Sequence, residues 1–227
     1  MSSSAVVFVH GWGGSFARTW QEPGWAALVE DAGRSVIGVD LLGHGTAPRP
    51  HDDEAYADLT TRISDALPSE PVDAVGFSLG AITLLELACR EPHRFSRLVV
   101  MGVGANLFRA EAGTTILDAL EGRAAATDIT AQLFVQYANQ PGNDPVALAC
   151  VLRRPARRTL TPARLAALTM PVLVVLGDKD FAGPADPLIE ALPNARLVTL
   201  RNTDHFATTE SFAAIDATLD FLGALPA

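Results

Sequence analysis

Lysine and cysteine are almost absent from this sequence of 227 residues. Lys179 is the only lysine, so arginine supplies nearly all of the positive charge, and the formal net charge is −9 at pH 7. Because binding to nucleic-acid phosphates requires a basic surface, this acidic chain is not expected to bind nucleic acid. Cys89 and Cys150 stand far apart, without the spacing of a metal site, which favours free thiols in a reducing cytoplasm.

Long apolar runs are also missing. The first four residues carry no basic side chain, and the apolar run at 5–9 is too short for a signal-peptide core or a membrane span. The hydrophobic share of 48% and the charged share of 19% predict a soluble protein with a large core and exclude a disordered chain. The length favours one domain that carries an insertion.

Short apolar runs alternate with segments of helical periodicity along most of the chain. This alternation predicts an open, mainly parallel sheet of about six strands with helices on both faces. It stops between residues 105 and 169, where only helical segments are predicted. The sequence therefore predicts an α/β core, 1–104 and 170–227, with a helical cap, 105–169, inserted in it. The predicted strands are 5–9, 35–39, 72–77, 97–103, 171–177 and 195–200. The helices predicted from periodicity include 18–32 and 54–67.

A sharp turn is predicted where the strand 72–77 meets the next helix, whose apolar stripe is Leu79, Ile82, Leu85, Leu87 and Ala88. The turn has the pattern Gly-x-Ser-x-Gly, with Ser78 at its apex between Gly76 and Gly80. Such a turn strains the serine and exposes its hydroxyl, and the two glycines leave room for strand and helix to cross. Ser78 is thus a candidate nucleophile.

A serine nucleophile needs a nearby general base, usually a histidine. His10, His44 and His205 each follow a predicted strand, so all three are expected at the carboxyl edge of the sheet, where ligands bind in such folds. The acid that orients the base is expected at the same edge, where Asp178 and Asp180 follow the strand 171–177. The order Ser78, then Asp178 or Asp180, then His205 is that of the α/β-hydrolases.

Five motifs in order carry a resemblance that spans most of the chain outside the predicted cap. With them the chain resembles the α/β-hydrolases of the small serine carboxylesterase type, similar to esterases that act on pimeloyl-carrier methyl esters. The motifs are His10-Gly11, Asp40-x-x-Gly43-x-Gly45, Gly76-x-Ser78-x-Gly80, Gly177-x-x-Asp180 and Asp204-His205.

The resemblance implies a catalytic triad of Ser78, Asp180 and His205, with Asp178 as a loop-capping residue. It also implies an oxyanion hole formed by the backbone amides of Trp12 and Leu79, and neither a cofactor nor a metal. A serine nucleophile argues against haloalkane dehalogenase and epoxide hydrolase chemistry. The absence of proline from the loop after His10 weakens the resemblance to perhydrolases and carbon–carbon hydrolases.

The predicted cap is the only part of the chain with a basic bias. Residues 105–169 hold seven arginines and five acidic residues, or +2, which leaves ten basic and 21 acidic residues, or −11, for the rest. Four of these arginines form one cluster, Arg153, Arg154, Arg157 and Arg158. The cluster is either a solvated helix face or a site for an anionic partner, such as a carboxylate-bearing substrate or an acidic acyl carrier protein.

The sequence therefore predicts a serine-dependent hydrolase of small carboxylic esters that forms an acyl-enzyme. Two alternatives remain at this point. One is a lactonase or lyase that uses the same triad. The other is a non-enzymatic protein of the same fold that binds a ligand or transmits a signal.

Overall fold

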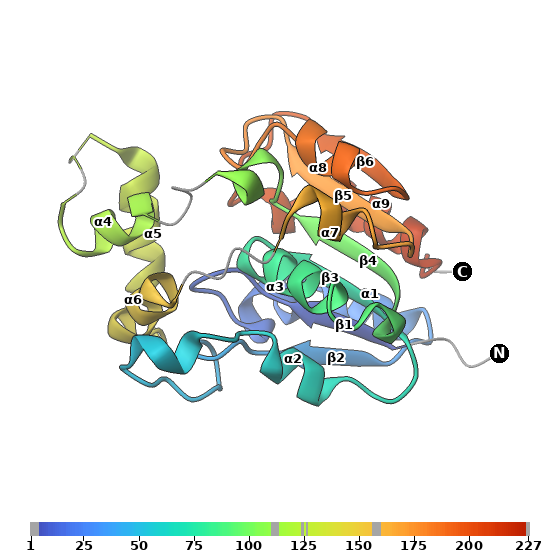
Figure 1. Cartoon of the computed structure of the whole chain (residues 1–227), viewed down its shortest axis with the longest axis horizontal. Coiled ribbons are helices and arrows are strands. Elements are labelled where there is room, and N and C mark those ends of the chain that lie inside the picture. The colour runs from blue at the N-terminus through green and yellow to red at the C-terminus, as the bar shows by residue number, and fades with distance from the viewer. Residues whose placement is uncertain (1–4, 110–113, 124, 126, 156–159, 226–227) are drawn as a thin grey trace.

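The computed structural model describes residues 5–109, 114–123, 125, 127–155 and 160–225 (Figure 1). Six strands form one parallel sheet in the order β2-β1-β3-β4-β5-β6. All six predicted strands are confirmed, with bounds that shift by no more than two residues. They are β1 (Val6–Val9), β2 (Val36–Val39), β3 (Val72–Phe77), β4 (Phe95–Met101), β5 (Val172–Gly177) and β6 (Ala195–Leu200).

Helices cover both faces of this sheet, as predicted. Alternate side chains of β1 show the two layers, because Val7 and Val9 belong to one buried cluster while Val6 and Phe8 belong to the other. The first cluster packs against α2 (Thr61–Ala66), α3 (Leu79–Ala88) and α8 (Asp186–Ala191). The second packs against α1 (Trp25–Asp31) and α9 (Phe212–Leu222). None of the helices in the described ranges is long and apolar enough to cross a membrane.

Two helices that the periodicity predicts as continuous are broken. The segment 18–32 is divided by Gly24, whose φ of 91° no helix can accommodate, into a π-helical turn (Ala17–Gln21) and α1. The segment 54–67 is divided into a 3₁₀ turn (Asp53–Tyr56) and α2. There the Asp58 carboxylate accepts hydrogen bonds from the Thr60 amide, 2.9 Å, and hydroxyl, and such local bonds compete with a continuous helix.

The predicted helical insertion lies between β4 and β5 and contains no strand among its described residues. Three of its helices lie together beyond the carboxyl ends of the strands (Figure 1), and we call them the cap helices. They are α4 (Thr114–Leu120), α5 (Ile129–Ala138) and α6 (Pro145–Arg153). A fourth helix, α7 (Pro162–Leu165), packs beside α8 at the sheet. The division into a core and a cap domain at residues 104 and 170 stays a prediction.

Both cysteines are free thiols. Cys150 is buried within α6, whereas Cys89, at the end of α3, is only half-buried.

Candidate active site

Ser78 joins the end of β3 to the start of α3. Its φ of 50° and ψ of −115° lie outside the regions that non-glycine residues favour, so the backbone is strained here as the sequence predicts. A Cβ on Gly76 would lie 2.8 Å from the backbone of Ala81, and one on Gly80 would lie 2.4 Å from the Val9 carbonyl oxygen. Larger residues at these two positions would therefore push α3 away from β3 and β1.

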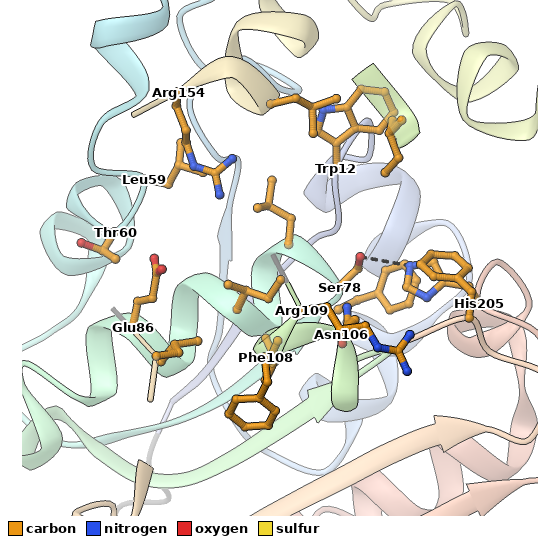
Figure 2. Close-up of a pocket in the computed structure, with 18 of the residues that line it drawn as sticks. Trp12, Leu59, Thr60, Ser78, Glu86, Asn106, Phe108, Arg109, Arg154 and His205 are labelled. Atoms are coloured by element: carbon orange, nitrogen blue, oxygen red, sulfur yellow. Dashed lines mark hydrogen bonds between the residues drawn. The ribbon is translucent and has the colours of Figure 1, made fainter. Parts of the chain in front are cut away.

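A chain of hydrogen bonds connects Ser78, His205 and Asp180, and Figure 2 shows its Ser78–His205 part. The Nε2 atom of His205 lies 3.0 Å from the Ser78 hydroxyl, and its Nδ1 atom lies 3.0 Å from both carboxylate oxygens of Asp180. His205 and Asp180 are 3% and 8% exposed, so water has little access to the bond between them. The Ala182 amide donates a further hydrogen bond, 2.8 Å, that fixes the Asp180 carboxylate.

Asp178 lies apart from this chain although it follows the same strand. Its side chain is exposed and accepts a hydrogen bond of 3.2 Å from the Thr203 amide. This bond ties the loop after β5 to the loop after β6. Of the two aspartates that position alone left open, the structure thus places Asp180 against His205 and gives Asp178 a loop-capping contact.

His10 and His44 are buried beside the loop that follows β1, with their rings 5.0 Å apart. His10 Nε2 accepts a hydrogen bond from the Leu41 amide, and its Nδ1–H donates to the Gly11 carbonyl. Backbone groups therefore engage both ring nitrogens of His10, which holds the loop in place. Burial lowers the pKa of His10, and burial together with the neighbouring His10 lowers the pKa of His44 from 6.5 to about 3.

These buried histidines predict that acid destabilises the fold. The folded protein keeps His44 neutral down to about pH 3, whereas the unfolded chain binds a proton near pH 6.5. Between these values the unfolded state binds more protons. The free energy of unfolding therefore decreases as the pH is lowered, by up to about 1.4 kcal/mol per pH unit for each such histidine. Urea unfolding at several pH values in this window measures that slope.

The matched variants are His44→Asn and His93→Asn. Asparagine removes the titrating ring from the buried position, so the first variant should show a shallower dependence of stability on pH. His93 is exposed, and its replacement should leave the slope as it is. If the unfolding free energy of His44→Asn depends on pH as steeply as that of the unchanged protein, the assignment of this dependence to His44 is contradicted.

Trp12 lies in the loop after β1, and Leu79 directly follows Ser78 in the serine turn. A Cβ on Gly11 would lie 3.3 Å from Ser78 Cβ, which shows how closely the loop after β1 packs against the turn. Neither the Trp12 nor the Leu79 amide donates a hydrogen bond to another described residue. Both N–H groups are thus unused among these residues, and the oxyanion hole that the two amides would form stays a prediction.

The same loop is attached to the cap. The Trp12 indole N–H donates to the Leu148 carbonyl of α6 at 3.0 Å. The Asn143 side-chain amide, between α5 and α6, donates to the Gly13 carbonyl at 2.8 Å. Arg18 donates to the Gln140 side-chain oxygen at 2.8 Å. These three contacts connect the cap helices directly to the loop that carries the Trp12 amide.

A cavity of about 1050 Å³ opens over Ser78 between the sheet and the cap. Its lining includes the aromatic side chains of Trp12, Phe77, Phe134, Phe181 and Phe206. The Phe77 and Phe181 ring centroids lie 4.9 and 4.3 Å from that of His205. Sequence reasoning missed Phe134, because its helix α5 carries no motif. Phe181 could have been found from its position next to Asp180.

Arg153 and Arg154, the two described members of the arginine cluster, have different surroundings. Arg153 is paired with Asp53, 3.1 Å, and Glu121, 3.2 Å. Arg154 instead lines the cavity over Ser78 (Figure 2). Arg157 and Arg158 lie outside the described residues, so their role stays a prediction.

Metal ligands are not grouped in the described part of the chain, where no three His, Cys, Asp or Glu side chains could hold an ion together. The reactive groups at the site are the Ser78 hydroxyl, the His205 ring and the backbone amides of Trp12 and Leu79. This arrangement can carry out nucleophilic attack on a carbonyl group and bind the oxyanion that results.

The family follows from comparison with known proteins. The model of the alpha/beta hydrolase fold family matches residues 4–152. The chain belongs to the α/β-hydrolase family. A family member from Neisseria meningitidis serogroup C, a pimeloyl-(acyl-carrier protein) methyl ester esterase, is 30% identical and covers 92% of this chain and 91% of its own. The 2-hydroxymuconate semialdehyde hydrolase of a Pseudomonas species is 28% identical, with coverage of 96% and 86%.

Solved structures of other family members confirm the fold. An esterase from Thermogutta terrifontis superposes with a TM-score of 0.74 at 20% identity, over 100% of this chain and 92% of its own. The enol-lactonase of Burkholderia xenovorans superposes with a TM-score of 0.69 at 22% identity, over 98% and 92%. At these identities the similarity concerns the fold and not the substrate.

Proposed function

We propose that the protein is a serine-dependent hydrolase of carboxylic esters that works through an acyl-enzyme. The observation that carries this proposal is the pair of contacts of His205, whose Nε2 lies 3.0 Å from the Ser78 hydroxyl while Nδ1 lies 3.0 Å from Asp180. The relationship to esterases and other hydrolases of the family supports it.

In the first half of the proposed reaction Ser78 attacks the ester carbonyl. Asp180 accepts the hydrogen bond from His205 Nδ1–H, which leaves Nε2 with a lone pair that takes the proton of the Ser78 hydroxyl. The carbonyl oxygen becomes an oxyanion, and the amides of Trp12 and Leu79 donate to it. The tetrahedral intermediate then collapses, His205 gives the proton to the leaving oxygen, and the alcohol departs.

In the second half water releases the acid. His205 Nε2 takes a proton from a water molecule, whose oxygen attacks the acyl carbon of the ester that now includes Ser78. The same two amides stabilise the second oxyanion. Collapse returns the proton from His205 to Ser78 and frees the carboxylic acid, so one water is consumed for each ester cleaved.

The cavity supports a small-molecule ester as the substrate. Aromatic and aliphatic side chains form much of its lining, which fits the apolar part of an acyl or alcohol chain. The relationship to the Neisseria esterase and the basic bias of the insertion extend the proposal to esters carried by an acidic acyl carrier protein.

Hydrolysis in ¹⁸O-labelled water tests the proposed reaction. We expect methyl and p-nitrophenyl esters to yield free alcohol and an acid that contains one labelled oxygen, because water attacks the acyl-enzyme. A lactone series run in parallel reports lactonase activity. Substrate cleavage without incorporation of label would favour a lyase. If neither the esters nor the lactones react, the ligand-binding alternative is favoured.

A further inference from the structure

The cavity extends from Ser78 along one face of α3. Ser78, Leu79, Ile82, Glu86 and Arg90 all line it, and their spacing of three or four residues puts the helical ones on one stripe. With a rise of about 1.5 Å per residue, Glu86 lies roughly 12 Å along the helix from Ser78. The floor of the cavity thus changes from apolar, at Leu79 and Ile82, to charged, at Glu86 and Arg90.

The walls above this floor are largely apolar. Leu59, Leu152 and Leu160 line the cavity on the side of α6, and Phe108 and Ile116 line it elsewhere. A distance of about 12 Å corresponds to roughly nine or ten carbon–carbon bonds of about 1.5 Å in an extended chain. A hydrocarbon chain that starts at Ser78 can therefore reach the charged end without burying a polar group on the way.

Arg154 enters the cavity at this charged end. It directly follows α6, and its guanidinium points into the space between Leu59 and Ser78 (Figure 2). Burial lowers the pKa of Arg154, and the negative charge of Glu86 opposes that effect. The two charges thus act on each other, but they are not within ion-pair distance, since no ion pair of Arg154 occurs among the described residues.

The neighbouring arginines form ion pairs with carboxylates. Arg153 contacts the carboxylates of Asp53 and Glu121, and Arg90 contacts that of Asp58 at 2.7 Å. The Arg154 guanidinium donates only to the Val151 carbonyl within the described part of the chain. A guanidinium has five N–H donors and a charge that is costly to bury without a partner. Arg154 therefore offers an anion a fork of donors inside the cavity.

We propose that Arg154 is a specificity-determining residue that binds an anionic group, a carboxylate, at the far end of the substrate chain. The preferred substrate is then an ester whose chain carries a carboxylate roughly 12 Å from the ester carbon, a spacing set by the rise of α3. This inference rests on the proposed ester hydrolysis. The carboxylate belongs either to the acyl chain or to the alcohol, and the two sources share the same recognition by Arg154.

The test compares kcat/KM for charged and uncharged esters of matched length. One arm uses monomethyl esters of dicarboxylic acids of increasing length against methyl esters of the corresponding alkanoic acids. The other uses butyrate esters of ω-hydroxy acids against those of the corresponding alcohols. We expect one arm to show a preference for the charged ester that peaks at one chain length, and this arm identifies the side of the ester that lies over α3.

Arg154→Gln should lower the ratio of charged to uncharged kcat/KM by about tenfold to a hundredfold, mainly through KM, the range expected for hydrogen bonds to a charged group. Arg154→Lys keeps the charge and should restore part of the ratio. Arg153→Gln is the matched control, because Arg153 does not line the cavity, and should leave the ratio unchanged.

An unchanged ratio in Arg154→Gln, or no preference for charged esters in the unchanged protein, overturns the subsite. Hydrolysis of uncharged esters in that case leaves the proposed function standing. No hydrolysis of any ester overturns the proposed function itself. Binding of the monomethyl dicarboxylates to the Ser78→Ala protein, measured by calorimetry, then decides the subsite, which requires weaker binding when Arg154→Gln is added.

Discussion

Replacement of Ser78 by alanine is expected to lower kcat on carboxylic esters by at least about 10⁴-fold, the scale on which loss of a nucleophile acts in serine hydrolases. The Ser78 hydroxyl lies 3.0 Å from His205 Nε2, and without it no acyl-enzyme can form. Alanine removes a single oxygen and leaves the turn between β3 and α3 in place. The loss should therefore appear in kcat while the protein unfolds at an unchanged or slightly higher temperature.

Labelling with a fluorophosphonate gives an independent measurement of the same residue. The unchanged protein should be labelled at Ser78, and Ser78→Ala should not be labelled at all. Ser69→Ala is the control, because Ser69 is exposed and its hydroxyl donates to the neighbouring Glu70. Ester hydrolysis that persists in Ser78→Ala would contradict the proposed acyl-enzyme mechanism.

Replacement of Asp180 by asparagine is expected to lower kcat by about 10⁴-fold, the effect known for this change in serine proteases. An asparagine amide that faces His205 Nδ1 donates a hydrogen bond, so the ring proton moves to Nε2. A protonated Nε2 cannot accept the proton of the Ser78 hydroxyl, although the three residues keep their positions. Steady-state rates on an activated ester, with circular dichroism to verify folding, measure the effect.

Asp178→Asn is the matched control for this prediction. The two aspartates follow the same strand, but Asp178 is exposed and caps the loop through the Thr203 amide. Its replacement should change kcat less than about threefold, within the small effect of a surface substitution. A larger loss in Asp178→Asn than in Asp180→Asn would reverse the assignment of the two residues.

The sheet and the proximity of Ser78, Asp180 and His205 could be predicted because both depend on local signals. Each strand is a short apolar run, and parallel strands bring their carboxyl ends to one edge of the sheet. Ser78, Asp180 and His205 each follow such a strand, so their approach requires no knowledge of the packing elsewhere. The choice of Asp180 over Asp178 came from the family resemblance, since position alone did not separate them.

The interior of the cavity could not be predicted in the same way. Periodicity identified Leu79, Ile82 and Leu85 as one apolar stripe of α3, yet Ile82 faces the cavity while Leu85 is buried in the core. The side that a helix presents to a cavity depends on where the cap lies. Nothing local to Arg154 distinguishes it from Arg153, although one lines the cavity and the other is paired with acidic side chains.

The breaks in the predicted helices have a different cause. The periodicity places Gly24 and Asp58 on the polar faces of the two predicted helices and gives no sign of a break at either residue. A left-handed glycine and a side-chain-to-backbone bond interrupt the helices. Such single-residue effects compete with periodicity and are decided by the tertiary contacts on either side.

The hydrogen bonds between the cap and the loop after β1 limit how this enzyme family member can evolve. Trp12 is bound to Leu148 and Gly13 to Asn143, so the peptide that would bind the oxyanion is braced by residues outside the sheet. A chimaera that receives another member's cap inherits new specificity only if the donor supplies equivalent anchors. Insertions near Asn143 or Leu148 are therefore constrained.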